Sequence, residues 1–278
     1  MKHKYSLAYL TVLGIDPVSQ IRIAKKTGYD FVSLRTIPMH LPGEPEFLLH
    51  KDSALFADVR AALEDSAVKL SDIELARIRQ DLDIAEYEPA FEAAAELGAS
   101  DVLGSIWTRD RIFYTQQAAQ LCRTAAEYGL RYNIEFLPWA GVRNLQEAVT
   151  LIDDLRKLGV GNARIMVDTL HAGRAGVTAE ELKRTDAGYY GFMHICDGPV
   201  GPARDPVLDD IRDPLMLKTA REERLYPGEG VMDIRGMAEA TGAEVLSIEL
   251  PNLARMAEFG AEKHAEICLE YAKKLLEN

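Results

Sequence analysis

Cysteine is scarce in this chain, and its three cysteines, Cys122, Cys196 and Cys268, lie far apart in the sequence. No Cys-x-x-Cys pair occurs, so neither a disulfide framework nor a cysteine-rich zinc site is expected. Basic residues are outnumbered, with 32 Lys and Arg against 44 Asp and Glu and a net charge of −12, which argues against a general nucleic-acid surface. Apolar runs of membrane-spanning length are missing, and the first residues lack the apolar core of a signal peptide. We therefore expect a cytoplasmic protein that binds neither nucleic acid nor a membrane.

Apolar runs of strand length recur along the chain and alternate with segments of helical pattern. The runs predict strands at Tyr5–Val12, Phe31–Thr36, Asp72–Ile78, Val102–Trp107, Tyr132–Leu137, Arg164–Thr169, Tyr190–Cys196 and Val245–Leu250. Helices are predicted at Pro17–Lys26, Asp52–Lys69, Ala85–Leu97, Thr115–Tyr128, Asn144–Leu158, Pro214–Glu223 and Ala261–Leu276. Glycine follows several of these helices directly, as expected where a helix ends.

The repeated strand–helix order predicts a parallel α/β fold. About eight such units in a chain of 278 residues have the size of a (β/α)8 TIM barrel, so we expect one barrel domain over residues 1–278. A doubly wound sheet is the alternative, but no Gly-x-Gly-x-x-Gly motif follows the first predicted strand.

Four acidic or imidazole residues stand at or near the ends of the last four predicted strands: Glu135, Asp168, His194 and Glu249. The carboxyl ends of parallel barrel strands meet at one rim, so these side chains should converge. Three carboxylates and an imidazole would repel one another there unless a divalent cation neutralised them. We expect one divalent ion bound by these four residues, with Mn²⁺ favoured and Mg²⁺, Co²⁺ or Zn²⁺ as alternatives.

The order of several short motifs resembles the sugar phosphate isomerase/epimerase family, whose members have a xylose-isomerase-like barrel. The matching motifs are Ile134-Glu135-Phe136, Val167-Asp168-Thr169-Leu170-His171, Met193-His194-Ile195-Cys196-Asp197, Pro227-Gly228-Glu229-Gly230 and Ile248-Glu249-Leu250. They cover the second half of the chain, and the first half matches mainly in its strand–helix rhythm. Relatives include ketose 3-epimerases, hydroxypyruvate isomerase, inosose dehydratase and dehydroshikimate dehydratase. The resemblance implies that Glu135, Asp168, His194 and Glu249 bind the metal and that His171 points at the substrate. A loop histidine that holds the Asp168 turn is the alternative explanation for His171.

The resemblance also implies a mechanism in which Glu135 and Glu249 flank the substrate as base and acid. A divalent ion can chelate a carbonyl oxygen and the adjacent hydroxyl, and so stabilise an enediolate. Protonation on the opposite face gives epimerisation, protonation at the neighbouring carbon gives isomerisation, and loss of a β-hydroxyl gives dehydration. We therefore expect a metal-dependent isomerase or epimerase of a carbohydrate or hydroxy-keto acid. A dehydratase of the inosose or dehydroshikimate type and a non-catalytic partner subunit are the alternatives, and a homo-oligomer is compatible with each.

Three further residues at predicted strand ends are candidates for substrate binding. Arg35 ends the second predicted strand and Arg77 the third, and arginine pairs with carboxylate or phosphate. Salt bridges to the many acids of the chain are the other explanation for each arginine, so an anionic substrate is left open. Trp107 ends the fourth strand and could form an apolar wall beside a sugar ring.

Two segments interrupt the strand–helix rhythm. The proline-rich segment from Pro199 to Pro227 predicts a lid over the barrel mouth, with Arg224 as its favoured substrate contact and Arg204 as the lesser one. A second insertion, Pro38–Lys51, follows the second predicted strand and is expected on the same face.

Overall fold

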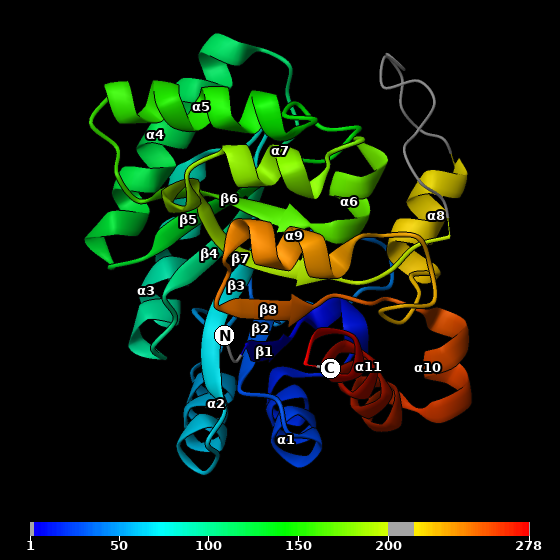
Figure 1. Cartoon of the computed structure of the whole chain (residues 1–278). Coiled ribbons are helices and arrows are strands. Elements are labelled where there is room, and N and C mark those ends of the chain that lie inside the picture. Colours follow the sequence, from blue (N-terminus) through cyan, green and yellow to red (C-terminus); the bar gives the residue numbers. More distant parts are fainter. Residues whose placement is uncertain (1–2, 200–213, 278) are drawn as a thin grey trace.

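Residues 3–199 and 214–277 are described by the computed structural model. Eight strands close into a barrel in which each strand pairs in parallel with the next and the last pairs with the first (Figure 1). They are β1 (Lys4–Leu7), β2 (Phe31–Arg35), β3 (Lys69–Ile78), β4 (Asp101–Ile106), β5 (Arg131–Glu135), β6 (Ala163–Asp168), β7 (Tyr190–Ile195) and β8 (Val245–Ile248). The predicted (β/α)8 barrel is confirmed.

Helices surround the barrel on its outer side (Figure 1). The longer ones are α1 (Pro17–Thr27), α2 (Ser53–Glu64), α3 (Glu88–Glu96), α4 (Arg111–Glu127), α5 (Leu145–Lys157), α8 (Pro214–Glu222), α9 (Ile234–Thr241) and α11 (Ala261–Leu276). Short helices α6 (Thr169–Arg174), α7 (Ala179–Arg184) and α10 (Leu253–Phe259) and the 3₁₀ turns η1 (Tyr9–Val12), η2 (Ile84–Tyr87) and η3 (Ala187–Tyr189) complete the set. Within the described ranges, no helix combines the length and the apolar composition that a membrane span requires.

Helix α1 shows how the sequence sets helix boundaries in this fold. The Asp16 side chain accepts a hydrogen bond of 2.9 Å from the Ser19 N–H, and Pro17 occupies the first turn, where no intrahelical N–H partner is needed. At the other end Gly28 has φ +90° and its N–H donates to the Ala24 carbonyl. A residue with a Cβ would be strained in that left-handed conformation, so glycine ends the helix.

Two of the predicted boundaries at the start of the chain are wrong. The first strand ends at Leu7, because Tyr9–Val12 turns into η1, where the Thr11 hydroxyl donates to the Ile248 carbonyl at 2.7 Å. The helix predicted to reach Lys69 ends at Glu64, because Lys69 already pairs with Phe31 as the first residue of β3. In both segments contacts with distant strands override the local pattern.

Two later boundaries also differ from the prediction. The helix expected at Ala85–Leu97 is divided into η2 and α3, with Pro89 in the first turn of α3, where its missing N–H costs nothing. Helix α4 begins at Arg111 rather than Thr115, because Asp110 caps it by accepting from the Phe113 N–H at 3.0 Å.

Candidate metal centre

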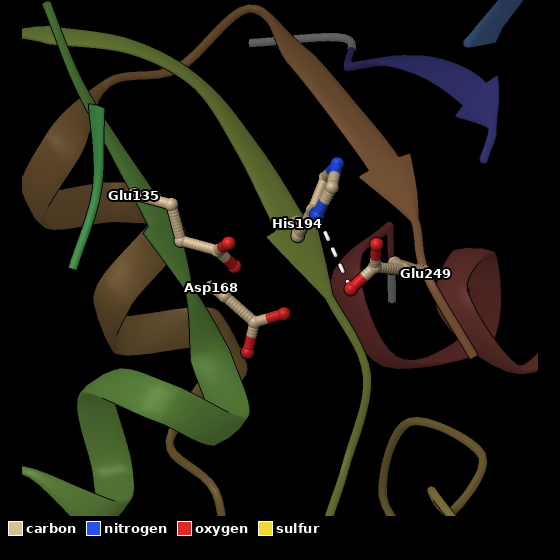
Figure 2. A group of neighbouring side chains, drawn as sticks. All are labelled: Glu135, Asp168, His194 and Glu249. Atoms are coloured by element: carbon tan, nitrogen blue, oxygen red, sulfur yellow. Dashed lines mark ion pairs between the residues drawn. The ribbon is translucent and has the colours of Figure 1, made fainter. Parts of the chain in front are cut away.

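Glu135, Asp168, His194 and Glu249 come together at the carboxyl ends of four consecutive strands, as Figure 2 shows. Glu135 and Asp168 are the last residues of β5 and β6, His194 lies one residue before the end of β7, and Glu249 directly follows β8. One ligand atom from each residue lies within 4.8 Å of those of the other three, and all four side chains are buried. The predicted convergence on one rim is therefore present in the structure.

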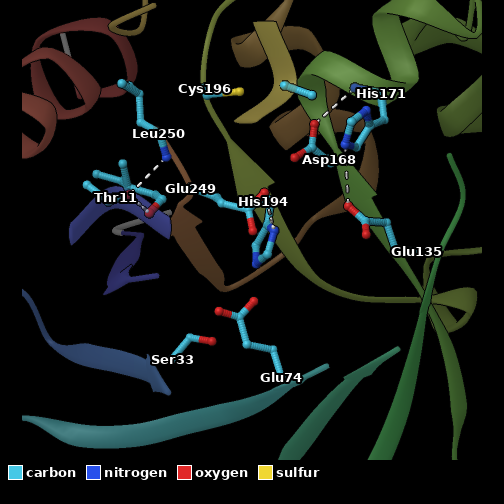
Figure 3. Close-up of polar contacts among 12 residues, drawn as sticks. Thr11, Ser33, Glu74, Glu135, Asp168, His171, His194, Cys196, Glu249 and Leu250 are labelled. Carbon is cyan, nitrogen blue, oxygen red and sulfur yellow. Dashed lines mark hydrogen bonds and ion pairs between the residues drawn. The ribbon is translucent and has the colours of Figure 1, made fainter. Parts of the chain in front are cut away.

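The barrel ladder and the first turn of α6 fix these side chains. Asp168 pairs directly with His194 across β6 and β7, so these two residues lie side by side. Glu135 pairs with Met166, and His194 pairs with Ser247, each two residues before the next member of the cluster. Asp168 also caps α6, because its Oδ1 accepts the His171 N–H at 2.9 Å (Figure 3).

Charge within the cluster is unevenly distributed. Burial raises the pKa of Glu135 well above its usual value, and the carboxylates of Glu249 and Asp168 raise it further. Burial also acts to raise the pKa of Glu249, but His194 and Arg224 outweigh it and hold that pKa below its ordinary range. Burial alone would lower the pKa of His194, yet the surrounding carboxylates, with Glu249 foremost, raise it to about 10. Each group therefore depends on its neighbours for charge compensation.

The residues fit a divalent cation. Both ring nitrogens of His194 are buried without a hydrogen-bond partner, although Nδ1 lies 3.4 Å from Glu249 Oε2. A buried imidazole nitrogen without a partner is costly, and a metal ion would satisfy one of them. The donor set of three carboxylates and one imidazole suits Mn²⁺, Mg²⁺ or Zn²⁺, and does not by itself select among them.

Arg224 lies inside the site rather than at the surface of a lid. Its Nη1 donates to Asp168 Oδ2 at 2.6 Å and its Nη2 lies 2.8 Å from Glu249 Oε2, so the guanidinium pairs with two of the four clustered residues. Only 2% of this residue is exposed. The predicted lid is only partly visible: residues 200–213, which include Arg204, are outside the described ranges, whereas Ala220 and Arg221 of α8 line the cavity over the cluster.

Most of the residues predicted to bind substrate line the same cavity. Its lining includes Arg35, Trp107, His171 and Arg224 together with Glu135 and Glu249.

His171 is buried, with Nε2 3.8 Å from Glu135 Oε1 and its ring edge-on to Trp139 at 5.0 Å. Burial lowers its pKa to about 4, which keeps the imidazole neutral and able to donate or accept a hydrogen bond. Arg77 does not belong to this lining, and its Nη2 donates to the Met39 carbonyl at 3.2 Å.

Glu74 of β3 is a further residue of this cavity, and we did not select it from the sequence. It is buried, it lines the cavity, and in Figure 3 its carboxylate points toward His194. Burial raises its pKa, and Arg35 opposes that effect. Its signal in the sequence is Ile73-Glu74-Leu75, an acid between apolar residues in the middle of a strand rather than at the strand's end.

The fold and this cluster define the protein as a (β/α)8 barrel with a buried Glu-Asp-His-Glu group at its carboxyl rim that could hold a metal ion. A family model described as xylose isomerase-like TIM barrel matches residues 21–271. The chain belongs to that family.

Solved structures with the same barrel extend over nearly the whole chain. An IolI protein with a bound zinc atom is 19% identical, with a TM-score of 0.77, and the match covers 99% of this chain and 98% of that one. A D-psicose 3-epimerase with D-tagatose from Clostridium cellulolyticum H10 is 15% identical, with a TM-score of 0.70 and coverage of 98% and 99%. At these identities the likeness shows the fold. A search of curated proteins gave no match.

Proposed function

We propose that the protein is a divalent-metal-dependent isomerase or epimerase of a carbohydrate or hydroxy-keto acid. The observation that carries the proposal is the convergence of Glu135, Asp168, His194 and Glu249 within 4.8 Å at the barrel rim, beneath a cavity. Active sites of this barrel lie at that rim. The two solved barrels described above add support, because the IolI structure holds zinc and the D-psicose 3-epimerase structure holds D-tagatose.

A divalent ion held by these four residues would polarise a substrate carbonyl and an adjacent hydroxyl. Mn²⁺ is our first choice, and Zn²⁺ is the ion in the IolI structure. Ketose, inosose and keto-acid substrates all present the required pair of adjacent oxygens.

Glu135 and Glu249 are proposed to transfer the proton. They come from β5 and from the end of β8, and so approach the cavity from different parts of the rim. Removal of the proton next to the carbonyl by one and its return by the other would give the epimer or the isomer.

Metal analysis and isotope exchange test the proposal together. The protein reconstituted with Mn²⁺ should hold about one equivalent per four-ligand site, and Asp168→Ala should lose it, whereas the exposed Asp81→Ala control should not. With D-fructose in D₂O, the metal-loaded protein should incorporate deuterium beside the carbonyl. Glu135→Gln and Glu249→Gln should each slow this exchange about a hundredfold or more.

Four other outcomes would change the proposal. Stoichiometric metal in Asp168→Ala would remove the ligand assignment, and full exchange in both glutamine variants would remove the acid–base roles. Turnover without any exchange would indicate a hydride shift, and a new absorbance from a conjugated product would indicate the dehydratase alternative.

A further inference from the structure

Glu74 and Arg35 face each other in the cavity, and each has an unused hydrogen-bonding group. Glu74 is 1% exposed, and neither of its carboxylate oxygens accepts a hydrogen bond from the described residues. The Arg35 Nε–H is buried and likewise has no acceptor. Glu74 Oε1 and Arg35 Nε are 3.6 Å apart, too far for a good hydrogen bond, and both residues line the cavity.

Two other residues, Glu44 and Tyr9, contact the Arg35 guanidinium. Its Nη1 donates to Glu44 Oε1 at 2.7 Å, and its guanidinium lies 4.8 Å from the centre of the Tyr9 ring. Arg35 is therefore held in place by Glu44 and Tyr9, which leaves the Nε edge turned toward Glu74. Through Glu44, the Pro38–Lys51 segment thus helps to position Arg35 beside Glu74.

We propose that Glu74 and Arg35 form a subsite for one hydroxyl group of a polyhydroxy substrate. A hydroxyl both donates and accepts, so a single oxygen between them can donate to Glu74 and accept from Arg35 Nε. A carboxylate or phosphate would be repelled by Glu74, and an ammonium group by Arg35. The inference rests on the proposed function, and it narrows the substrate to a compound whose uncharged polyol end reaches β2 and β3.

The charges of the other residues that line the cavity also favour an uncharged group at this end of the ligand. The charge of Arg35 is balanced by Glu44 and Glu74, and that of Arg224 by Asp168 and Glu249, so neither arginine carries an excess positive charge that would favour a substrate anion. Arg221 also lines the cavity, but its side chain is exposed, and an anion paired with it there gains little over water.

Tryptophan fluorescence gives a binding readout that does not depend on turnover. The chain has two tryptophans, Trp107 and Trp139, and both line the cavity. We would titrate the Mn²⁺-loaded protein with D-fructose, with its monodeoxy analogues, and with 5-keto-D-gluconate as an anionic counterpart of similar size. The variants are Glu74→Gln and Arg35→Gln, and Glu46→Gln is the control, a partly exposed glutamate paired with His40 in the loop that also supplies Glu44.

The expected result is a loss of D-fructose affinity of about tenfold to a hundredfold in Glu74→Gln, the size of a hydrogen bond to a charged acceptor, and no loss in Glu46→Gln. Arg35→Gln should lower the affinity too, and the two losses should not add, because both groups hold the same hydroxyl. For the one deoxy analogue that lacks this hydroxyl, wild type and Glu74→Gln should bind equally. The wild type should bind 5-keto-D-gluconate more weakly than D-fructose, and Glu74→Gln should narrow that difference.

The inference is overturned if Glu74→Gln binds D-fructose and every deoxy analogue as the wild type does, since the pair then holds only water. It is also overturned if the wild type prefers the anion. Loss of metal binding and of isotope exchange in the wild type would instead refute the proposed function. If Glu74→Gln does not fold, as judged by circular dichroism, Arg35→Gln with the deoxy series applies the same test from the donor side.

Discussion

At the scale of single residues, the Arg224 side chain holds two acids of the cluster in place. Its guanidinium pairs with Asp168 and Glu249, and it also donates to the Glu249 carbonyl at 3.1 Å and, through Nε, to the Ala220 carbonyl at 2.8 Å. All of these partners are buried or belong to the backbone. Its role as a substrate contact stays a prediction, but its part in holding two of the clustered carboxylates is visible in the structure.

Replacing Arg224 by alanine should therefore destabilise the fold. Two buried carboxylates would lose their cation, a change that typically costs about 3–5 kcal/mol. Urea unfolding measures this loss, and added Mn²⁺ should recover part of it by compensating the same carboxylates. Arg221→Ala is the matched control, because Arg221 belongs to the neighbouring helix α8 and its side chain is exposed. Equal stability of the two variants would contradict the structural role of Arg224.

At the scale of single elements, strand β4 shows a close approach of neighbouring strands around a glycine. A Cβ at Gly104 would collide with the Tyr132 ring and hydroxyl and with the Ala76 backbone carbonyl. Tyr132 lies there because its hydroxyl donates to the Ala76 carbonyl at 2.9 Å, which ties β5 to β3 across β4. Glycine is thus required in the middle of a strand, where it is otherwise unfavourable.

Gly104→Ala should lower the free energy of unfolding by about 1–3 kcal/mol, the usual cost of overpacking a core. Gly161→Ala is the control, since a Cβ there meets no atom within 4 Å and its φ is not left-handed. Chemical denaturation of both variants checks the prediction, which fails if Gly104→Ala is as stable as the control.

The sequence predicts the position of a helix, strand or site residue where the interactions that determine it involve residues close together in the chain. The cap of α5 at Asn144 and the four polar residues at strand ends follow from patterns within a few residues. The burial of Arg224 could not be predicted, because its partner Asp168 is 56 residues away in the sequence. The short helices α6 and α7, of six residues each, also escaped prediction, because they are too short to show a helical period.

The closed barrel as a whole buries several ionisable groups away from its surface. Asp72 of β3 is fully buried, and its Oδ2 accepts a hydrogen bond of 2.5 Å from the Ser33 hydroxyl of β2, whereas Oδ1 has no partner. Burial raises its pKa from 3.8 to about 7. The barrel therefore keeps this carboxyl protonated at a pH where an unfolded chain would release the proton.

The raised pKa of Asp72 predicts that the stability of the whole molecule depends on pH. Between pH 3.8 and about 7 the folded state holds the Asp72 proton and the unfolded state does not, so the contribution is full below pH 3.8 and is lost as the pH rises toward 7. The asparagine of Asp72→Asn cannot ionise, so the free energy of unfolding of this variant does not fall through this group as the pH rises. Its stability relative to the wild type should improve by up to about 1.4 kcal/mol for each pH unit across this window.

Urea unfolding of the wild type and Asp72→Asn at pH 5, 6 and 7 would measure the difference, with the surface variant Asp81→Asn as the control for loss of one negative charge. His171 acts in the opposite direction, because a buried imidazole with a pKa of about 4 loses stability as the pH falls below 6.5. That contribution is present in both proteins and cancels in the comparison. A difference that stays constant over the three pH values would mean that Asp72 is ionised inside the barrel, and its charge would then have to be compensated by a group other than Ser33.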